Sequence, residues 1–201
     1  PLRIADLFCG AGGAAMGLHR AGFEVVGFDV APQPRYPFEF HQQDALTVDL
    51  SGFDAVWASP PCQGYSIMQN LPWLRGRKYP LLILPAREML DAIGKPYIIE
   101  NVMGARYGAK GLKKRSIEAH GMQAGWLCGG MFGLPFYRHR LFEANWFWMQ
   151  PGHPKHRNRI RPGRSLAGRA RDFVYSEAED ARGAESWPGR RTADVGFSPR
   201  P

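Results

Sequence analysis

Short apolar runs alternate with helix-like stretches through the first hundred residues, and each run stops at a cluster of small or polar side chains. Strands are expected at 3–8, 23–30, 53–62 (where the strand runs into a loop) and 96–102, and helices at 14–22 and 81–94. A further strand is expected just before Asp44, and the clusters that follow the strands are 9–13, Asp29, Asp44, 59–62 and 100–101. Strand–helix alternation favours a parallel sheet covered on both faces, which binds ligands where its strands end. We therefore predict an α/β fold with its site at that edge.

Composition limits the class of protein. A chain of 201 residues with 44% hydrophobic and 22% charged residues is typical of one soluble globular domain. No apolar run reaches the length of a membrane span, and no basic-then-apolar leader opens the chain, so neither a membrane segment nor a secretory signal is expected. The net charge of +8 favours a polyanionic partner, although charge alone is weak support for nucleic-acid binding.

The three cysteines, Cys9, Cys62 and Cys128, are widely spaced and form no CxxC pair. This spacing argues against both a disulfide framework and a structural zinc site. It suits a reducing cytosol, where a thiol stays free. We therefore expect no bound metal.

The character of the chain changes near residue 150. Between residues 151 and 171 there are six arginines and one lysine without an acidic residue, and the remainder to 201 is rich in Gly, Pro, Arg and Glu without periodicity. We predict a folded domain over 1–150 and an extended, partly disordered tail over 151–201. The basic stretch 155–171 fits a solvated tail and a phosphate-binding segment equally well.

A glycine-rich loop follows the first predicted strand. Gly10 and Gly12 allow the backbone to approach a ligand and leave amides at the start of the next helix. Asp29 ends the second strand, where a carboxylate binds ribose hydroxyls, and Asp44 is placed to accept a bond from an adenine amino group. The alternative is a purely structural turn. The two acids favour an adenosine-containing cofactor and leave nicotinamide and S-adenosylmethionine both open.

The loop SPPCQGYS points to a reactive cysteine. Pro60 and Pro61 stiffen the backbone before Cys62, and Gly64 allows a close approach after it. A buried structural cysteine more often lies within an apolar run. A free thiol has a pKa of about 8.5, so nearby positive charge would help to form the thiolate. The context indicates a nucleophile.

Glu100 and Asn101 end the apolar run PYII. A carboxyl group in apolar surroundings has a raised pKa and serves as an acid near neutral pH. The alternative role for Glu100 is an ion pair, for which the RHR segment at 138–140 offers arginines. The two roles are compatible.

Taken together, these segments closely resemble the cytosine-5 DNA methyltransferase family. The matching stretches are, in order, DLFCGAGG, GFDV, QQDA, SPPCQGYS, ENV and YRHRLFE, and they span residues 6–143. The resemblance implies a Rossmann-like fold with a mostly parallel sheet and S-adenosylmethionine as cofactor. It implies methyl transfer to C5 of cytosine in double-stranded DNA, as in restriction–modification systems. The small size suggests a phage- or mobile-element-like member.

The resemblance also implies catalytic roles. Cys62 would attack C6 of a cytosine flipped out of the duplex. Glu100 would protonate or hydrogen-bond N3, and Arg140 would contact O2 and steady Glu100. Arg138 would lie near the target backbone, and Asn101 would brace the cysteine loop.

The implied cofactor-binding residues are Phe8, Gly10, Gly12, Asp29, Asp44 and Pro60. The first three would line the methionine side of the pocket, Asp29 would bind the ribose and Asp44 the adenine. His139, between the two arginines, is interpreted as a spacer that faces the other way.

The chain departs from the family after residue 143. Neither a recognition region nor the two closing motifs can be located, so a minimal enzyme, a truncated chain and an inactive remnant are all open. A relative that binds DNA or S-adenosylmethionine without turnover is the main competing hypothesis. A nicotinamide-dependent oxidoreductase would leave the cysteine loop unexplained, and tRNA is a further candidate substrate. As an enzyme, the protein would be a monomer in the cytoplasm of a bacterium or phage-infected cell.

Overall fold

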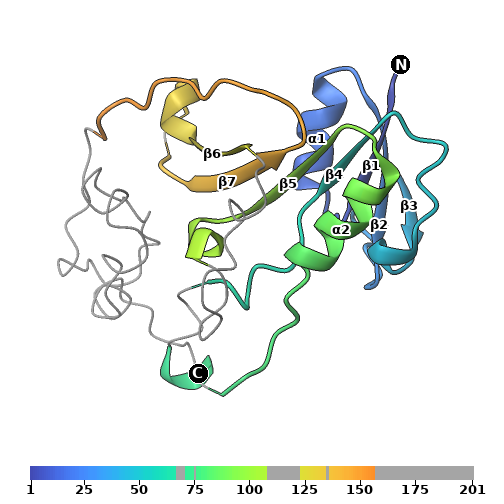
Figure 1. The fold of residues 1–201 in the computed structure, drawn as a ribbon, viewed down its shortest axis with the longest axis horizontal. Helices are drawn as coiled ribbons and strands as arrows, with labels where there is room; N and C mark the ends of the chain where they lie inside the picture. The colour runs from blue at the N-terminus through green and yellow to red at the C-terminus, as the bar shows by residue number, and fades with distance from the viewer. Residues whose placement is uncertain (67–70, 75, 108–122, 135, 157–201) are drawn as a thin grey trace.

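A computed structural model describes residues 1–66, 71–74, 76–107, 123–134 and 136–156 (Figure 1). Its strands are β1 (Arg3–Leu7), β2 (Glu24–Asp29), β3 (Glu39–Gln42), β4 (Ala55–Ala58), β5 (Tyr97–Val102), β6 (Gln123–Cys128) and β7 (His139–Ala144). The helices are α1 (Gly13–Arg20) and α2 (Ile83–Ile93), with short 3₁₀ turns η1 (Ala45–Thr47), η3 (Pro72–Leu74), η4 (Met103–Tyr107) and η6 (Gly129–Phe132). Neither of these helices is long and apolar enough to cross a membrane.

The strands form one sheet in the order β3-β2-β1-β4-β5-β7-β6. Neighbouring strands from β3 to β5 are parallel, whereas β7 is antiparallel to both β5 and β6. The predicted α/β, Rossmann-like fold with a mostly parallel sheet is confirmed. The strands β6 and β7 were not anticipated from the sequence, because neither segment alternates clearly between apolar and polar residues.

The helix predicted at 81–94 runs from Ile83 to Ile93 and is capped by Gly94, whose φ of 69° is the left-handed conformation that closes many helices. Pro85 lies in the first turn, where a backbone N–H has no partner within the helix. The proline therefore does not interrupt the helix. Of the segment 151–201, predicted as a tail, residues 157–201 lie outside the described residues.

Both faces of the sheet are covered, because alternate residues of each strand face opposite sides. On one face, Ile4 and Val25 pack with Ala15 of α1. On the other, Leu7, Val56 and Ile99 belong to a larger core that includes Ile83 and Leu90 of α2. The two clusters fix the sheet between its helices and so hold the strand ends in register.

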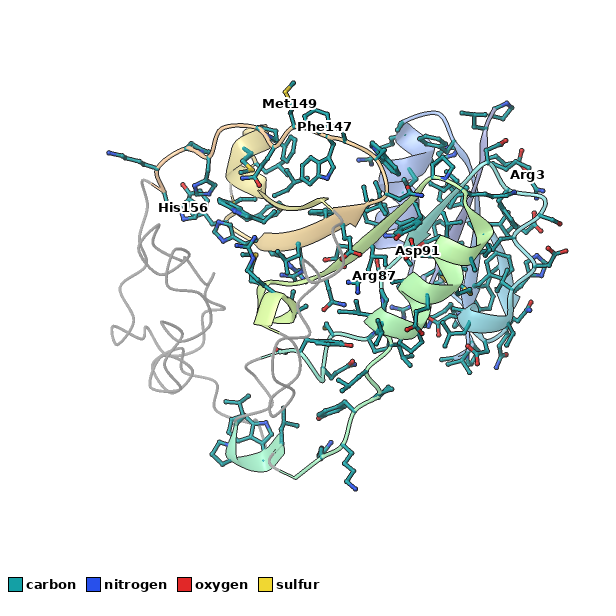
Figure 2. The ribbon with its side chains drawn as sticks, in the orientation of Figure 1. Arg3, Arg87, Asp91, Phe147, Met149 and His156 are labelled. Atoms are coloured by element: carbon teal, nitrogen blue, oxygen red, sulfur yellow. The ribbon has the colours of Figure 1, made fainter. Side chains whose placement is uncertain are left out.

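A buried ion pair ties α2 to β7. Arg87, labelled on α2 in Figure 2, donates from Nη2 to Oε2 of Glu143 at 2.8 Å and from Nε to Oε1. The side chains are 4% and 0% exposed. Two hydrogen bonds in the fork geometry of a guanidinium and a carboxylate satisfy charges that would otherwise be costly to bury. The pair therefore fixes where β7 lies beside β5.

Removing one partner should be far more damaging than removing both. We expect Glu143→Leu or Arg87→Met alone to lower the free energy of unfolding by about 3–5 kcal/mol, since each leaves an uncompensated buried charge. The double variant should lose clearly less than the sum. Urea unfolding of the parent and three variants measures this, and additive losses would contradict the account.

Candidate active site

A cavity of about 520 Å³ opens where the parallel strands end. It lies at the switch in strand order between β1 and β4, the usual ligand site of an open α/β sheet. Among the predicted site residues, those that line the cavity are Phe8, Asp29, Asp44, Pro60, Cys62, Glu100, Arg138 and Arg140. Gly10, Gly12 and Asn101 lie outside that lining.

The cysteine loop leaves β4 directly and carries Cys62 half-buried at the cavity wall. The carbonyl of Cys62 accepts from the amides of Tyr65 at 3.0 Å and Ser66 at 2.9 Å, which closes a tight turn after the thiol. Before it, the Asn101 side chain donates from Nδ2 to the Pro60 carbonyl at 2.9 Å. A buried amide on β5 thus holds the loop on β4.

Glu100 faces the cavity from β5, and its carboxylate pairs with Arg140. The Arg140 Nε lies 3.0 Å from Glu100 Oε1. Burial raises the pKa of Glu100, while Arg140, Arg138 and a hydrogen bond from Ser59 act to lower it. Burial outweighs these, so the carboxyl holds a proton at higher pH than a free glutamate would.

Arg140 reaches the cavity because β7 runs against β5. Val102, near the end of β5, lies opposite Arg140, near the beginning of β7. The side chain is 25% exposed and donates from Nη1 to the His139 carbonyl at 2.8 Å. Arg138, just before the strand, is exposed at the cavity rim. The reversed strand therefore adds two positive charges to an edge otherwise built from parallel strands.

The glycine loop has an unusual backbone. Phe8 adopts a φ of 57°, which is rare for a residue with a side chain and typical of functional sites. Gly12 has a φ of 85°, and a Cβ there would lie 2.5 Å from Cδ of Pro37. Only glycine fits that position, so Gly12 shapes the loop although it does not line the cavity.

The two predicted cofactor acids are held by backbone amides. Asp29 accepts from Gly10 at 3.0 Å and from Ala31 at 2.9 Å. Asp44 accepts from Leu46 at 3.0 Å and so caps η1. Each carboxylate retains further lone pairs toward the cavity that both residues line.

Ser59 was not given a role from the sequence. It accepts a hydrogen bond from Trp57 Nε1 at 2.8 Å and hydrogen-bonds Glu100. The side chain therefore connects the cysteine loop to the buried carboxyl group. Its position, between a predicted strand and two prolines, was the one sequence feature that could have indicated a role at the site.

A second buried carboxyl group, that of Asp6, lies within β1 and is fully buried. The Tyr36 hydroxyl donates to its Oδ2 at 3.1 Å. Burial, with a smaller contribution from Asp29, raises the pKa of Asp6 to about 7. An aspartate inside an apolar run was the sequence clue to this group, which lies beneath the glycine loop.

The raised pKa of Asp6 makes stability depend on pH. Between pH 4 and 7 the Asp6 side chain ionises in the unfolded chain but stays protonated in the folded one. The contribution of Asp6 to the free energy of unfolding is therefore full below pH 4 and lost by pH 7. Relative to Asp6→Asn, the parent should lose stability on the order of a few kcal/mol across that range. Urea unfolding at several pH values checks this, with the exposed Asp49→Asn as control. Parallel profiles for the parent and Asp6→Asn would refute it.

The expectation that the chain lacks a cluster of cysteine and histidine ligands is wrong. Cys128, His139, His153 and His156 bring one ligand atom each to within 4.8 Å of one another. The sequence could not reveal this, because pairing of β6 with β7 places Cys128 opposite His139. Burial lowers the pKa of His139 to about 3, so its ring is neutral. As expected, His139 does not line the cavity, and on the side that it faces it belongs to this cluster.

The chain is an open α/β sheet with a cavity at its switch point, and a cysteine, a buried glutamate and two arginines line that cavity. This arrangement is typical of α/β proteins that bind a ligand where their strands end. Residues 2–142 match the family described as C-5 cytosine-specific DNA methylase. The chain belongs to that family, and the resemblance found in its motifs is confirmed.

The relatives are longer proteins. Type II methyltransferase M.FnuDI of Fusobacterium nucleatum is 28% identical over 128 residues, which cover 59% of this chain and 36% of that protein. M.AgeI of Thalassovita gelatinovora is 26% identical, covering 81% of this chain and 44% of that protein. The chain thus spans less than half the length of these two relatives. Among solved structures, S. pombe Dnmt2 methyltransferase is 19% identical with a TM-score of 0.48, covering 74% of this chain and 51% of that one.

Proposed function

We propose that this protein is a DNA (cytosine-5-)-methyltransferase that works through a covalent adduct of Cys62. One observation carries the proposal. A single cavity is lined by a cysteine on a stiff loop, a buried glutamate paired with an arginine, and two acids suited to a nucleoside. The family membership of residues 2–142 supports the same chemistry.

Cys62 acts as the nucleophile. Its thiolate forms a bond to C6 of the cytosine. The electron pair of the C5–C6 double bond then shifts onto C5, where it is conjugated with C4 and N3, so C5 becomes nucleophilic. After methylation, loss of the C5 proton returns that pair and expels the thiolate. The target base must leave the duplex stack for the thiol to reach C6. The cavity at the cysteine loop is the place for it.

Glu100 acts as the acid at N3. A proton or strong hydrogen bond at N3 takes up the charge that develops in the ring when the thiolate attacks. The raised pKa supports this role, because the carboxyl group keeps its proton, and can donate it, at a higher pH than an ordinary glutamate. Ser59 and Arg140 hold the carboxyl in place.

Arg140 contacts the base O2, and Asn101 acts at a distance from the base. The Arg140 guanidinium carries five N–H donors, pairs with Glu100 and lines the same cavity. Arg138, exposed at the rim, meets the phosphate backbone. Asn101 is a positioning residue, since its hydrogen bond to Pro60 fixes the loop that presents Cys62.

S-adenosylmethionine is the methyl donor, and its sulfonium group supplies the methyl that C5 receives. The residues present fit such a ligand. Asp29 and Asp44 offer carboxylate oxygens to hydroxyl and amino groups, while Phe8 and Pro60 give apolar walls. Asp29 is held by Gly10 and Ala31, which orients it before the ligand arrives.

The second candidate is a relative that binds DNA or S-adenosylmethionine without turnover. It is kept as an alternative because neither closing motif of the family is located after residue 143 of this sequence. The joint presence of Cys62, Glu100 and Arg140 in one cavity favours the enzyme, because a binding protein has no need of a nucleophile.

Methylation itself distinguishes the two candidates. The purified chain, incubated with unmethylated bacterial genomic DNA and S-adenosylmethionine, should produce 5-methylcytosine, measured by mass spectrometry of the digested nucleosides. Cys62→Ser should produce none, while Cys9→Ala, which removes a buried cysteine outside the cavity lining, should remain active. If the folded chain binds the cofactor but makes no product, the binding-only relative is the better description.

The pH dependence tests Glu100. In the parent, the single-turnover rate should fall at high pH as Glu100 loses its proton, at a pH above that of an ordinary glutamate because burial raises its pKa. Glu100→Gln should be slower by about 10² or more and should lack the fall at high pH. Cofactor affinity, measured by calorimetry, should be unchanged. A variant that keeps the parent's pH profile would rule out Glu100 as the acid.

A further inference from the structure

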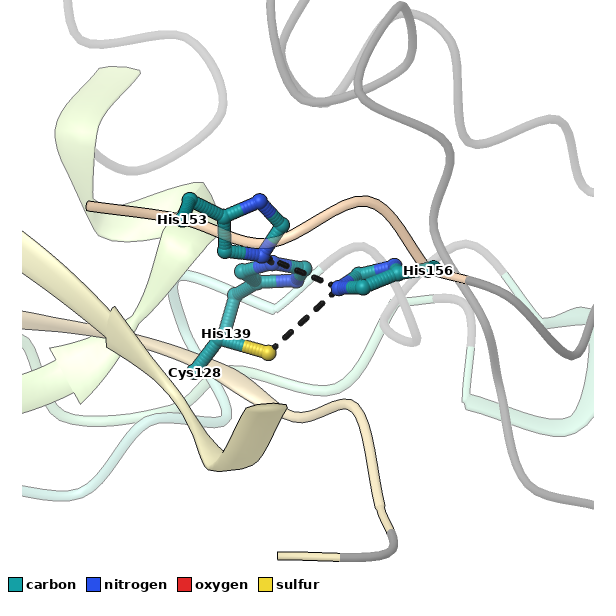
Figure 3. Close-up of side chains that lie close together, drawn as sticks. All are labelled: Cys128, His139, His153 and His156. Carbon is teal, nitrogen blue, oxygen red and sulfur yellow. Dashed lines mark hydrogen bonds between the residues drawn. The ribbon is translucent and has the colours of Figure 1, made fainter. Parts of the chain in front are cut away.

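Four metal-ligating side chains converge on one point at the end of the β6–β7 hairpin. Figure 3 shows Cys128, His139, His153 and His156 directed toward one another. His153 Nε2 lies 3.2 Å from His139 Nε2 and 2.9 Å from His156 Nε2. His156 Nε2 lies 3.5 Å from Cys128 Sγ. All three rings therefore present the same atom, Nε2, to the common point.

We propose that these four side chains bind one Zn²⁺ ion in a tetrahedral Cys-His₃ site. One thiolate and three imidazole nitrogens are ligands that zinc prefers, and four-coordination by protein atoms is typical of a structural zinc site. The inference is independent of the methyltransferase proposal.

Three separations between ligand atoms are close to those of such a site. With Zn–N bonds of about 2.0 Å and a Zn–S bond of about 2.3 Å, a tetrahedron places two nitrogens about 3.3 Å apart and a nitrogen and sulfur about 3.5 Å apart. The observed nitrogen separations are 3.2 and 2.9 Å, and the nitrogen–sulfur separation is 3.5 Å. All four ligand atoms lie within 4.8 Å of one another, so binding an ion would also draw the more distant pairs together, by on the order of 1 Å.

The backbone delivers the ligands from two directions. Cys128 ends β6 and His139 begins β7, and the two residues pair across the hairpin. His153 and His156 follow on the segment after β7, with two residues between them. An ion would therefore join this segment to the hairpin.

Aromatic side chains hold the imidazoles in place. Trp126 of β6 meets the rings of His139 and His153 edge-on, at 5.0 and 4.8 Å between centroids. Tyr137 stacks on His156 at 3.9 Å. Cys128 and His139 are each 1% exposed, so the site is shielded on the sheet side. An apolar shell that fixes ligand orientation is characteristic of built metal sites.

The ion would have a structural role. His139 and Glu143 lie on one face of β7, whereas Arg140 lies between them on the opposite face, toward the cavity. Four protein ligands also leave no open position for a substrate. Zinc would fix the beginning of β7, and with it the position of Arg140, without entering the reaction.

Metal analysis of the full chain tests the site. The parent, purified and dialysed with Zn²⁺, should retain about one zinc per chain by mass spectrometry. His153→Ala and Cys128→Ser should retain much less, while His19→Ala and Cys9→Ala, which lie outside the cluster, should match the parent. A parent that retains no more zinc than the cluster variants would overturn the proposal.

Cobalt substitution gives a readout that does not depend on whether a variant folds. The parent loaded with Co²⁺ should show the intense visible bands of four-coordinate cobalt and a thiolate-to-cobalt charge-transfer band in the near ultraviolet. Cys128→Ser should lack the thiolate-to-cobalt charge-transfer band. A chelator should also lower the unfolding temperature of the zinc-loaded parent. A cluster held by hydrogen bonds alone would give no thiolate band and no response to the chelator, and either result would overturn the proposal.

Discussion

The direction of the strands is the constraint on which the site depends. From β3 to β5 the strands are parallel, so whatever follows each of them lies at the same edge of the sheet. The glycine loop, Asp29, Asp44, the cysteine loop and Glu100 meet there although they are far apart in the sequence. The antiparallel β7 starts where β5 ends, and this reversal alone brings Arg138 and Arg140 to the edge. Two opposite chain directions are therefore needed to place a nucleophile, an acid and its cationic partner in one cavity.

The placement of Arg140 beside Glu100 therefore depends on the position of β7 in the sheet. Toward its end, Glu143 is fixed by a buried ion pair to α2. At its beginning, His139 takes part in the cysteine–histidine cluster. Both groups lie on the face of β7 that points away from the cavity, so they hold the strand while Arg140 stays available to Glu100. An ion pair on one end and a metal on the other would limit sliding of the strand, and a slip by one residue would turn Arg140 away from the site.

The sequence predicted what local patterns encode. Apolar runs gave β1, β2, β4 and β5 within a few residues, and a helix-closing glycine marked the end of α2. Parallel topology placed Cys62 and Glu100 at one edge of the sheet, whereas a role for Arg140 beside them was implied only by the family resemblance. Groups defined by pairing across the sheet were missed. Cys128 and His139 become neighbours only through the β6–β7 register, and Ser59 contacts Glu100 only because β4 lies beside β5. Such contacts depend on tertiary packing, which the local periodicity of a sequence does not indicate.

The central claim is that Cys62 bonds to the target base, and trapping that bond tests it most directly. A pool of random-sequence duplexes with 5-fluorocytosine in place of cytosine would be incubated with the chain and S-adenosylmethionine. Fluorine at C5 cannot leave as a proton, so the thiolate cannot be expelled after methyl transfer. The account predicts a DNA–protein adduct that survives denaturing electrophoresis, requires S-adenosylmethionine and maps to the peptide containing Cys62. Methylation of ordinary cytosine without any adduct, or an adduct at another residue, would contradict it.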